Sequence, residues 1–228
     1  KSLYGAEVVT TITPIERNRV NVTFTMNEGE ATKIRDIRIV GTQVVAESTL
    51  LSLMDLTPSG WLTWYTKSDR YSRAKLNADL ETIRSYYVNR GYLEFVVEST
   101  QVTISPDKQD VRITINITEG DFLVVSEVVM EGDYLGRENE FRALIQIKPG
   151  EPYNADAVAK TTKAFTDYFG KFGFAFARVQ SLPDIDRNTN RVVLVLQADP
   201  SRRAYVRRIS VSGNTRSRTT SIRYDAAS

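Results

Sequence analysis

The side chains whose spacing most resembles a chemical site are Asp184, Asp186 and Asn188, which alternate oxygen-bearing groups as the start of a calcium-binding loop does. Such a loop also needs glycine at its sixth position and glutamate at its twelfth. Those positions hold Thr189 and Val195. The pattern therefore predicts a polar hairpin turn and no metal site.

Other chemistry is limited by two missing residue types, because the 228 residues include no histidine and no cysteine. The chain cannot supply a Ser-His-Asp or Cys-His pair, a zinc site of imidazole or thiolate ligands, a disulfide or an iron–sulfur cluster. Carboxylate, lysine and tyrosine chemistry are still open to it. No group of acidic residues has a spacing that implies a shared site, so we expect a protein that is not an enzyme and has no cofactor.

Charge and hydropathy are those of an ordinary globular protein, with 41% hydrophobic and 25% charged residues. Thirty Lys and Arg against 28 Asp and Glu give a net charge of +2, too small to indicate a nucleic-acid-binding field. No apolar run reaches the roughly 18 residues that a membrane-spanning helix needs. A binding partner must therefore be inferred from local sequence patterns.

A repeat organises the chain. Three segments alternate apolar and polar residues and end on glycine, at 34–41, 125–132 and 206–213. This alternation predicts a strand with one buried face, and the glycine predicts a turn with permissive backbone angles. Each segment therefore opens a structural unit.

The first two opening strands are each followed by a helical pattern. Gly91 and Gly173 stand four residues beyond the last apolar position, where a left-handed helix cap is expected. A shorter helix is expected before each long one, near 46–54 and 137–147. The apolar positions, 82 residues apart in the two units, are Leu76, Leu80, Ile83 and Tyr87, then Val158, Thr162, Phe165 and Phe169.

Each unit then ends in a strand pair around a polar turn. The order strand, helix, helix, strand, strand predicts the α+β class, with two helices packed on one face of a three-stranded mixed sheet. The expected strand, turn and strand are 93–103, 105–110 and 111–117 in one unit, and 174–178, 183–190 and 192–198 in the next.

Four domains are expected along the chain. The first is the C-terminal part of a unit, two complete units follow, and the last is the start of a further unit. The predicted ranges are 1–32, 33–120, 121–203 and 204–228.

Several motifs resemble the polypeptide-transport-associated, or POTRA, domains of the Omp85 family. They are the glycines at Gly41, Gly132 and Gly213 with their polar followers, the helix end Tyr-Tyr-Val-Asn-Arg-Gly-Tyr at 86–92, and the closing Ile-Thr-Glu-Gly at 117–120. The resemblance covers nearly the whole chain. It implies that the four domains are the end of a second POTRA domain, the third, the fourth, and the start of a fifth.

The resemblance implies a function without catalysis. POTRA arrays of this family are chaperone-like scaffolds at the periplasmic face of the Gram-negative outer membrane. They bind accessory lipoproteins and unfolded β-barrel precursors by β-augmentation and aid insertion of the precursors into the membrane. The resemblance further implies a full-length protein anchored by a C-terminal β-barrel, and other lipoproteins bound through the fifth domain. The small net charge, and the few aromatic residues among the C-terminal arginines, predict no nucleic-acid partner.

Such binding needs an exposed sheet edge, because a partner strand can add to the edge through main-chain hydrogen bonds. The best candidate is the strand at 92–105, which by resemblance contacts a BamB-like β-propeller lipoprotein. The implied contact residues are Glu94, Phe95, Glu98 and Ile104. The alternative is that Phe95 belongs to the core and that the glutamates only keep the edge soluble.

A cluster of Trp61, Trp64 and Tyr65 in the link between the two helices is a possible secondary contact. These aromatic residues either pin the loop onto the unit or present an anchor for a partner. Two other functions stay open. One is the POTRA region of another Omp85-superfamily translocator, of the two-partner secretion or TamA type. The other is an envelope glycan-binding module, which would need a concave aromatic site at this cluster.

Overall fold

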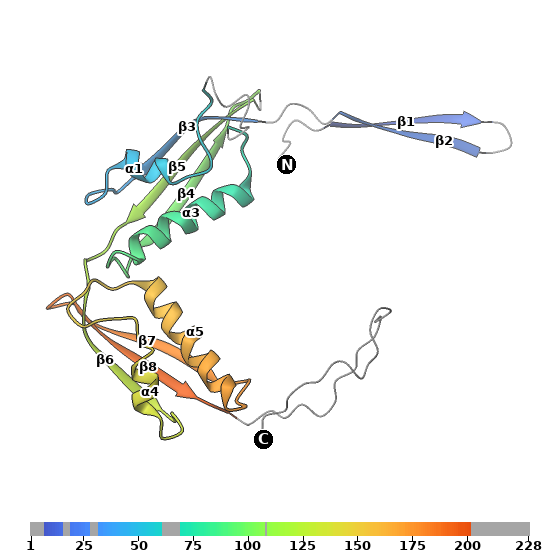
Figure 1. Ribbon diagram of the computed structural model, residues 1–228. Helices are drawn as coiled ribbons and strands as arrows, with labels where there is room; N and C mark the ends of the chain where they lie inside the picture. The colour runs from blue at the N-terminus through green and yellow to red at the C-terminus, as the bar shows by residue number, and fades with distance from the viewer. Residues whose placement is uncertain (1–6, 16–18, 28–31, 61–68, 108, 202–228) are drawn as a thin grey trace.

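A hairpin and two units of one design make up the described part of the chain in the computed structural model (Figure 1). The hairpin consists of β1 (Glu7–Ile15) and β2 (Arg19–Asn27), which pair antiparallel. The structural statements below concern the residues that the structure describes, which are 7–15, 19–27, 32–60, 69–107 and 109–201.

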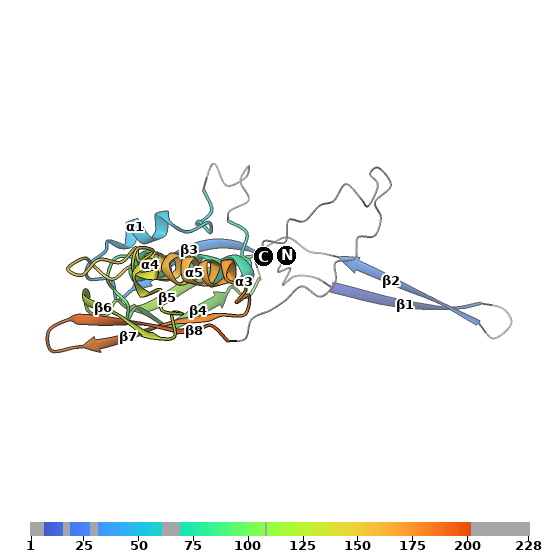
Figure 2. The same cartoon turned by 60° about the horizontal axis from the view of Figure 1, so that its bottom comes forward.

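Each unit places two helices on one face of a three-stranded sheet, as Figures 1 and 2 show. The first strand of each unit runs parallel to the last, which lies in the centre of the sheet and pairs antiparallel with the second strand. The α+β class with a mixed sheet is therefore confirmed. The first unit has β3 (Lys33–Val40), α1 (Glu47–Ser52), α3 (Arg73–Val88), β4 (Val96–Ile104) and β5 (Asp110–Thr118). The second has β6 (Val124–Gly132), α4 (Glu138–Arg142), α5 (Ala155–Lys171), β7 (Arg178–Asp186) and β8 (Arg191–Asp199).

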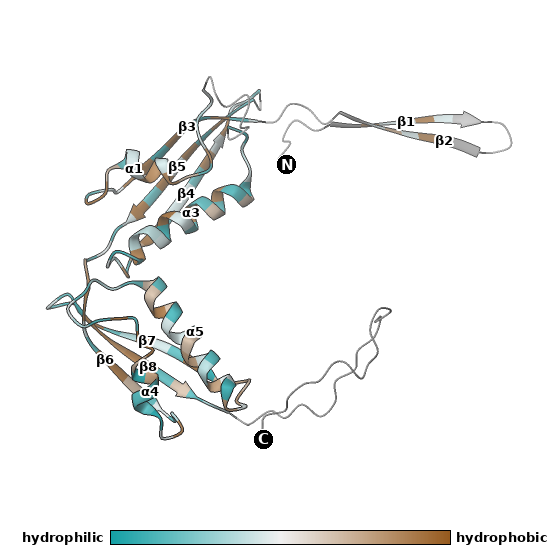
Figure 3. Cartoon of the chain, viewed as in Figure 1, coloured by the Kyte–Doolittle hydropathy of each residue, from teal (hydrophilic) through white to brown (hydrophobic). Residues whose placement is uncertain are grey.

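The central strands supply the core, because alternate residues of each point toward the helices. Brown, hydrophobic positions mark β6 and β8 in Figure 3, whereas both long helices carry teal, hydrophilic positions. Burial of these side chains is the main force that holds each unit together. The buried set is Val111, Ile113, Ile115 and Ile117 of β5, with Val192, Leu194, Leu196 and Ala198 of β8.

The predicted apolar faces of the long helices are confirmed except at two positions. In α3 Leu80 is only half-buried, and the buried residue beside it is Asp79, whose carboxylate accepts backbone N–H groups. In α5 the buried residue is Thr161, with no exposed surface, whereas Thr162 is only half-buried. Thr161 is buried because its hydroxyl donates to the carbonyl of Ala157 at 2.8 Å and accepts from the N–H of Gln146 at 3.1 Å. The correction follows from this tertiary hydrogen bond, which helical periodicity does not reveal.

The predicted left-handed glycines are confirmed, with φ +101° at Gly91 and +85° at Gly173. At Gly91 a side chain would also collide with a neighbour, because a Cβ there would lie 2.8 Å from the ring of Phe122. The position therefore requires glycine for both its backbone angle and its packing.

The last hairpin differs from the expected one. β7 begins at Arg178, not at Phe174, and it continues through Pro183 to Asp186, where a longer turn was expected. Proline can stand in this strand because β7 is at the edge of its sheet. No helix in the described part of the chain has the length and apolar character to span a bilayer.

Candidate interaction surface: the free edge of β4

The sheet of the first unit has two outer edges, at β3 and at β4. The chain itself covers the start of the β3 edge. The N–H of Ile34 donates to the carbonyl of Asp69 at 2.7 Å, and the carbonyl of Ile34 accepts from Ser59 at 2.8 Å. Backbone groups of this edge are therefore used within the fold.

The second unit covers its β6 edge in the same way. Val125 donates to the carbonyl of Glu151 at 3.0 Å and accepts from the N–H of Gly150 at 2.8 Å. Among the described residues, the outer edges of β4 and β7 have no backbone partner of this kind. An unpaired edge is a template for another strand.

Hydrogen bonding at the turn sets which groups of β4 point outward. Ser105 donates its N–H to the carbonyl of Asp110 at 2.9 Å. The β4–β5 register is regular between Ser99 and Ile104. Because antiparallel pairs alternate between bonded and unbonded residues, every second residue before Ser105 directs its N–H and C=O away from β5. These outward residues are Thr100, Val102 and Ile104.

A β-bulge limits this regular stretch at its beginning. Val97 pairs with Ile117 and Ser99 with Asn116, so Glu98 is an extra residue in β4. A bulge twists the strand and interrupts its ladder. The Glu98 carboxylate accepts a hydrogen bond from the Thr118 hydroxyl at 2.9 Å across the pair. The part of the edge available to a partner is thus six residues long, Ser99–Ile104.

The four residues implied by the resemblance have different environments. Glu98 and Ile104 lie in β4, whereas Glu94 and Phe95 precede it. Glu94 forms an ion pair of 2.6 Å with Arg187 of the second unit. Phe95 is 1% exposed, and its ring stacks on Tyr87 with centroids 4.5 Å apart. The predicted cluster of Trp61, Trp64 and Tyr65 lies outside the described residues.

A buried carboxylate supports the strand from within. Glu119 accepts hydrogen bonds from the Tyr87 hydroxyl at 2.6 Å and from the loop after β3, where Gln43 and Val44 each donate an N–H at 2.9 Å. Burial alone would raise the pKa of Glu119, but the bonds from Tyr87 and the loop outweigh it and lower the pKa. Burial first, and then the bond to Glu119, raise the pKa of Tyr87.

These contacts connect the core to the candidate edge. Tyr87 holds Glu119 with its hydroxyl and stacks on Phe95 with its ring, and Phe95 stands directly before β4. Sequence reasoning treated Glu119 as part of a closing motif and did not assign it this role. The available signal was an acidic residue directly after an alternating apolar strand.

The second unit lacks a counterpart of the Tyr87–Glu119 hydrogen bond. Phe169 stands 82 positions after Tyr87 and Pro200 stands 81 after Glu119, so neither polar partner is present. Instead the Tyr134 hydroxyl donates to the carbonyl of Leu196 at 2.7 Å. Burial raises the pKa of Tyr134 to about 12. The two units thus share a fold but not their internal polar contacts.

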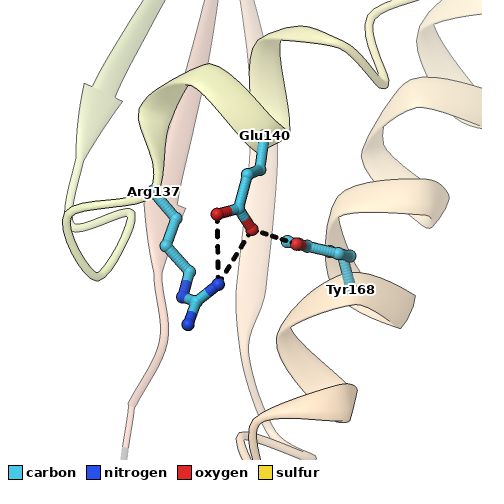
Figure 4. A network of polar contacts seen from close by, with 3 residues as sticks. All are labelled: Arg137, Glu140 and Tyr168. Carbon is cyan, nitrogen blue, oxygen red and sulfur yellow. Dashed lines mark hydrogen bonds and ion pairs between the residues drawn. The ribbon is translucent and has the colours of Figure 1, made fainter.

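A surface network joins α4 to α5 in the second unit (Figure 4). Arg137 donates to both carboxylate oxygens of Glu140, at 3.1 and 2.9 Å, and the Tyr168 hydroxyl donates to the same carboxylate. The bond from Tyr168, followed by that from Arg137, lowers the pKa of Glu140. The Arg137 and Glu140 side chains are solvent-exposed, so we assign their ion pair a modest role in holding the helices together.

Direct contacts also join the two units. The N–H of Asp156, in the first turn of α5, donates to the side-chain oxygen of Asn89 at 2.9 Å. The Leu123 N–H donates to the carbonyl of Gly91 at 2.8 Å. The end of α3 therefore meets the start of α5, an arrangement that Figure 1 shows. Together with the Glu94–Arg187 pair, these contacts oppose free rotation between the units.

Comparison with known families finds the POTRA family, described as "Surface antigen variable number repeat", which matches residues 32–120 and 123–200. These ranges contain the two complete units described above.

Individual relatives carry the same name. The chain is 30% identical over 213 residues to "Outer membrane protein assembly factor BamA" of Neisseria meningitidis serogroup B, covering 93% of this chain and 27% of the relative. It is 32% identical over 200 residues to the protein of that name in Buchnera aphidicola, covering 87% of this chain and 32% of the relative. The chain thus spans about a third or less of these relatives' length.

Among solved structures, the crystal structure of Haemophilus influenzae BamA POTRA3-5 superposes with a TM-score of 0.72. The two sequences are 26% identical, and the match covers 84% of this chain and 75% of the other. A BamA structure from Haemophilus ducreyi lacking POTRA domains 1-3 is 17% identical, covers 73% of this chain and 29% of the other, and has a TM-score of 0.58. The latter likeness concerns the fold alone.

Proposed function

This chain belongs to the POTRA family, and we propose that it is a non-enzymatic scaffold that binds extended segments of other proteins at the edge of β4 during outer-membrane protein assembly. The similarity to BamA supports this process and a place at the periplasmic face of the outer membrane. The likeness to POTRA3-5 supports numbering the two complete units as the third and fourth domains.

The observation that carries the proposal is the free edge of β4. Its outward N–H and C=O groups, at Thr100, Val102 and Ile104, can bond any extended chain whatever its side chains. That property suits unfolded barrel precursors, which share their strand character and little else. The neighbouring side chains of Gln101 and Thr103 are polar and exposed, which keeps an open edge soluble.

A folded partner with its own exposed strand or loop can use the same edge. We propose a BamB-like β-propeller lipoprotein as this partner, with contacts at Glu98 and Ile104. Glu94 and Phe95 are proposed to hold the start of β4 in place and not to touch the partner directly. Glu94 is paired with Arg187, and Phe95 packs in the core. Other lipoproteins are proposed to bind through a fifth domain, to which the residues after 203 would contribute.

The test is calorimetric titration of this chain with a purified BamB-like lipoprotein. Ile104→Pro removes an outward donor from the edge, and Ile104→Val keeps that donor while changing the side chain by one methyl group. Circular dichroism checks that both variants fold. We expect binding by the wild-type chain and by Ile104→Val, and loss of binding by Ile104→Pro. Equal binding by all three folded proteins would overturn the assignment to the β4 edge.

A further inference from the structure

The second unit has an edge strand in the same place as β4. β7 pairs antiparallel with β8 as β4 pairs with β5, and both strands are outermost in their sheets. The residue that pairs with Leu194 of β8 is Pro183, whereas the residue that pairs with Ile113 of β5 is Val102. Pro183 stands 81 positions after Val102, and Leu194 stands 81 positions after Ile113. Pro183 therefore occupies in the second unit the place of Val102 in the first.

The backbone nitrogen of Pro183 must face away from β8. Proline has no N–H to donate, so it is accepted within a ladder only where its nitrogen points out of the sheet. The equivalence to Val102 leads to the same direction, because the turn bond of Ser105 places the Val102 N–H on the outer side of β4. On β7 the outward residues beside it are Ser181 and Ile185.

We propose that Pro183 closes the outer edge of β7 to incoming strands, so that the two units together recruit one extended segment, at β4. This inference rests on the proposed function of the β4 edge. A strand laid on β7 would face the proline ring with a carbonyl that finds no donor, between the donors of Ser181 and Ile185. An unpaired buried carbonyl and the bulk of the ring both disfavour pairing.

No proline stands between Val96 and Ile104, so β4 lacks this block. The two units therefore differ in whether their edge strand can accept a partner strand. If both edges were open, an unfolded precursor could occupy either one, or bridge two molecules edge to edge. With β7 closed, each pair of units offers a single strand-binding position.

The experiment uses the 228-residue chain and a synthetic peptide of about ten residues, the length of a membrane-spanning strand. The peptide alternates valine and threonine, carries a lysine at each end for solubility, and has blocked termini. Calorimetry measures the number of peptides bound per chain, and amide chemical shifts locate them. Pro183→Val and Pro183→Ala both restore an outward N–H. Asp184→Val is the matched control, because it adds apolar surface to the next residue without adding an outward donor.

The two complete units of the wild-type chain should bind one peptide, and their amide shifts should be confined to Thr100–Ile104. Both Pro183 variants should bind a second peptide at β7, and Asp184→Val should still bind one. Relative to the wild type, affinity at β7 in Pro183→Val should rise about tenfold or more, the effect of one restored hydrogen bond. Val102→Pro should lose the β4 site, and combining it with Pro183→Val should move the single site to β7.

The experiment distinguishes failure of the role proposed for Pro183 from failure of the function proposed for the β4 edge. Binding of the peptide to β7 in the wild-type chain, or failure of both Pro183 variants to gain a site, overturns the role of Pro183. Absence of binding at β4 in the wild-type chain together with a gained site in Pro183→Val contradicts the proposed function of β4 and supports the role of Pro183.

Discussion

The Tyr87 hydroxyl donates a 2.6 Å hydrogen bond to Glu119 and thereby joins the last turn of α3 to the residue after β5. Glu119 is 6% exposed and Tyr87 is fully buried, so neither group can exchange this bond for water. Removing one partner leaves the other with an unmet hydrogen-bonding need, which costs more than the bond's net contribution.

Tyr87→Phe should lower the free energy of unfolding of the first unit by about 1–3 kcal/mol. The ring still stacks on Phe95, so the loss isolates the hydroxyl. Urea denaturation followed by tryptophan fluorescence measures it, because both tryptophans of the chain, Trp61 and Trp64, belong to this unit's sequence. The control is Tyr86→Phe, which keeps the half-buried ring beneath the Arg90 guanidinium. An equal loss in both variants would contradict the role of the buried bond.

Glu119→Gln should change how stability depends on pH. The folded-state pKa of Glu119 is lowered from an ordinary value of 4.5. A lowered pKa contributes stability that is complete above the unfolded value and is lost as pH falls through the folded value. The gap in unfolding free energy between the wild-type chain and Glu119→Gln should therefore be widest near neutral pH and should narrow below 4.5. A gap that stays constant between pH 7 and pH 3 would show that the charge of Glu119 is unimportant.

Asp79→Ala should destabilise the first unit by about 1–3 kcal/mol, because the buried Asp79 carboxylate accepts the N–H groups of Asp55 at 2.8 Å and Leu56 at 3.0 Å. Asp79→Asn keeps one acceptor oxygen and should lose less. Thr161 stands at the equivalent place in the second unit and accepts from Gln146. Urea denaturation of both Asp79 variants measures the difference, and equal losses would contradict the role assigned to these backbone hydrogen bonds.

Asn89→Ala should loosen the two units without unfolding either. Its side-chain oxygen accepts the Asp156 N–H from the second unit. Among the described contacts, this side chain makes no hydrogen bond within the first unit. We expect a change in the relative alignment of the units, measured by residual dipolar couplings, with a stability change within about 0.5 kcal/mol. The control is Asn77→Ala, on the exposed surface of α3, the helix that Asn89 directly follows. It should leave the alignment of the units unchanged.

Much of each unit could be predicted from local patterns. Most of the apolar face of α3, the left-handed glycines and the alternating strands depend on the chain's own periodicity and backbone freedom, so they can be predicted without tertiary contacts. The same reasoning failed where a side chain serves a distant backbone. Thr161 is buried in place of Thr162 because Gln146 needs an acceptor, and β7 begins at Arg178, after the exposed Phe176.

By itself the sequence determined the repeated α+β units, their family and the absence of histidine and cysteine chemistry, because periodicity, motif spacing and composition are properties of the chain alone. Only the tertiary structure decided which sheet edges are open. Hydrogen bonds to the carbonyls of Asp69 and Glu151 cover β3 and β6, and the register with β5 and β8 decides which way Val102 and Pro183 direct their backbone nitrogens. Pairing between distant segments determines both, so no local pattern encodes them.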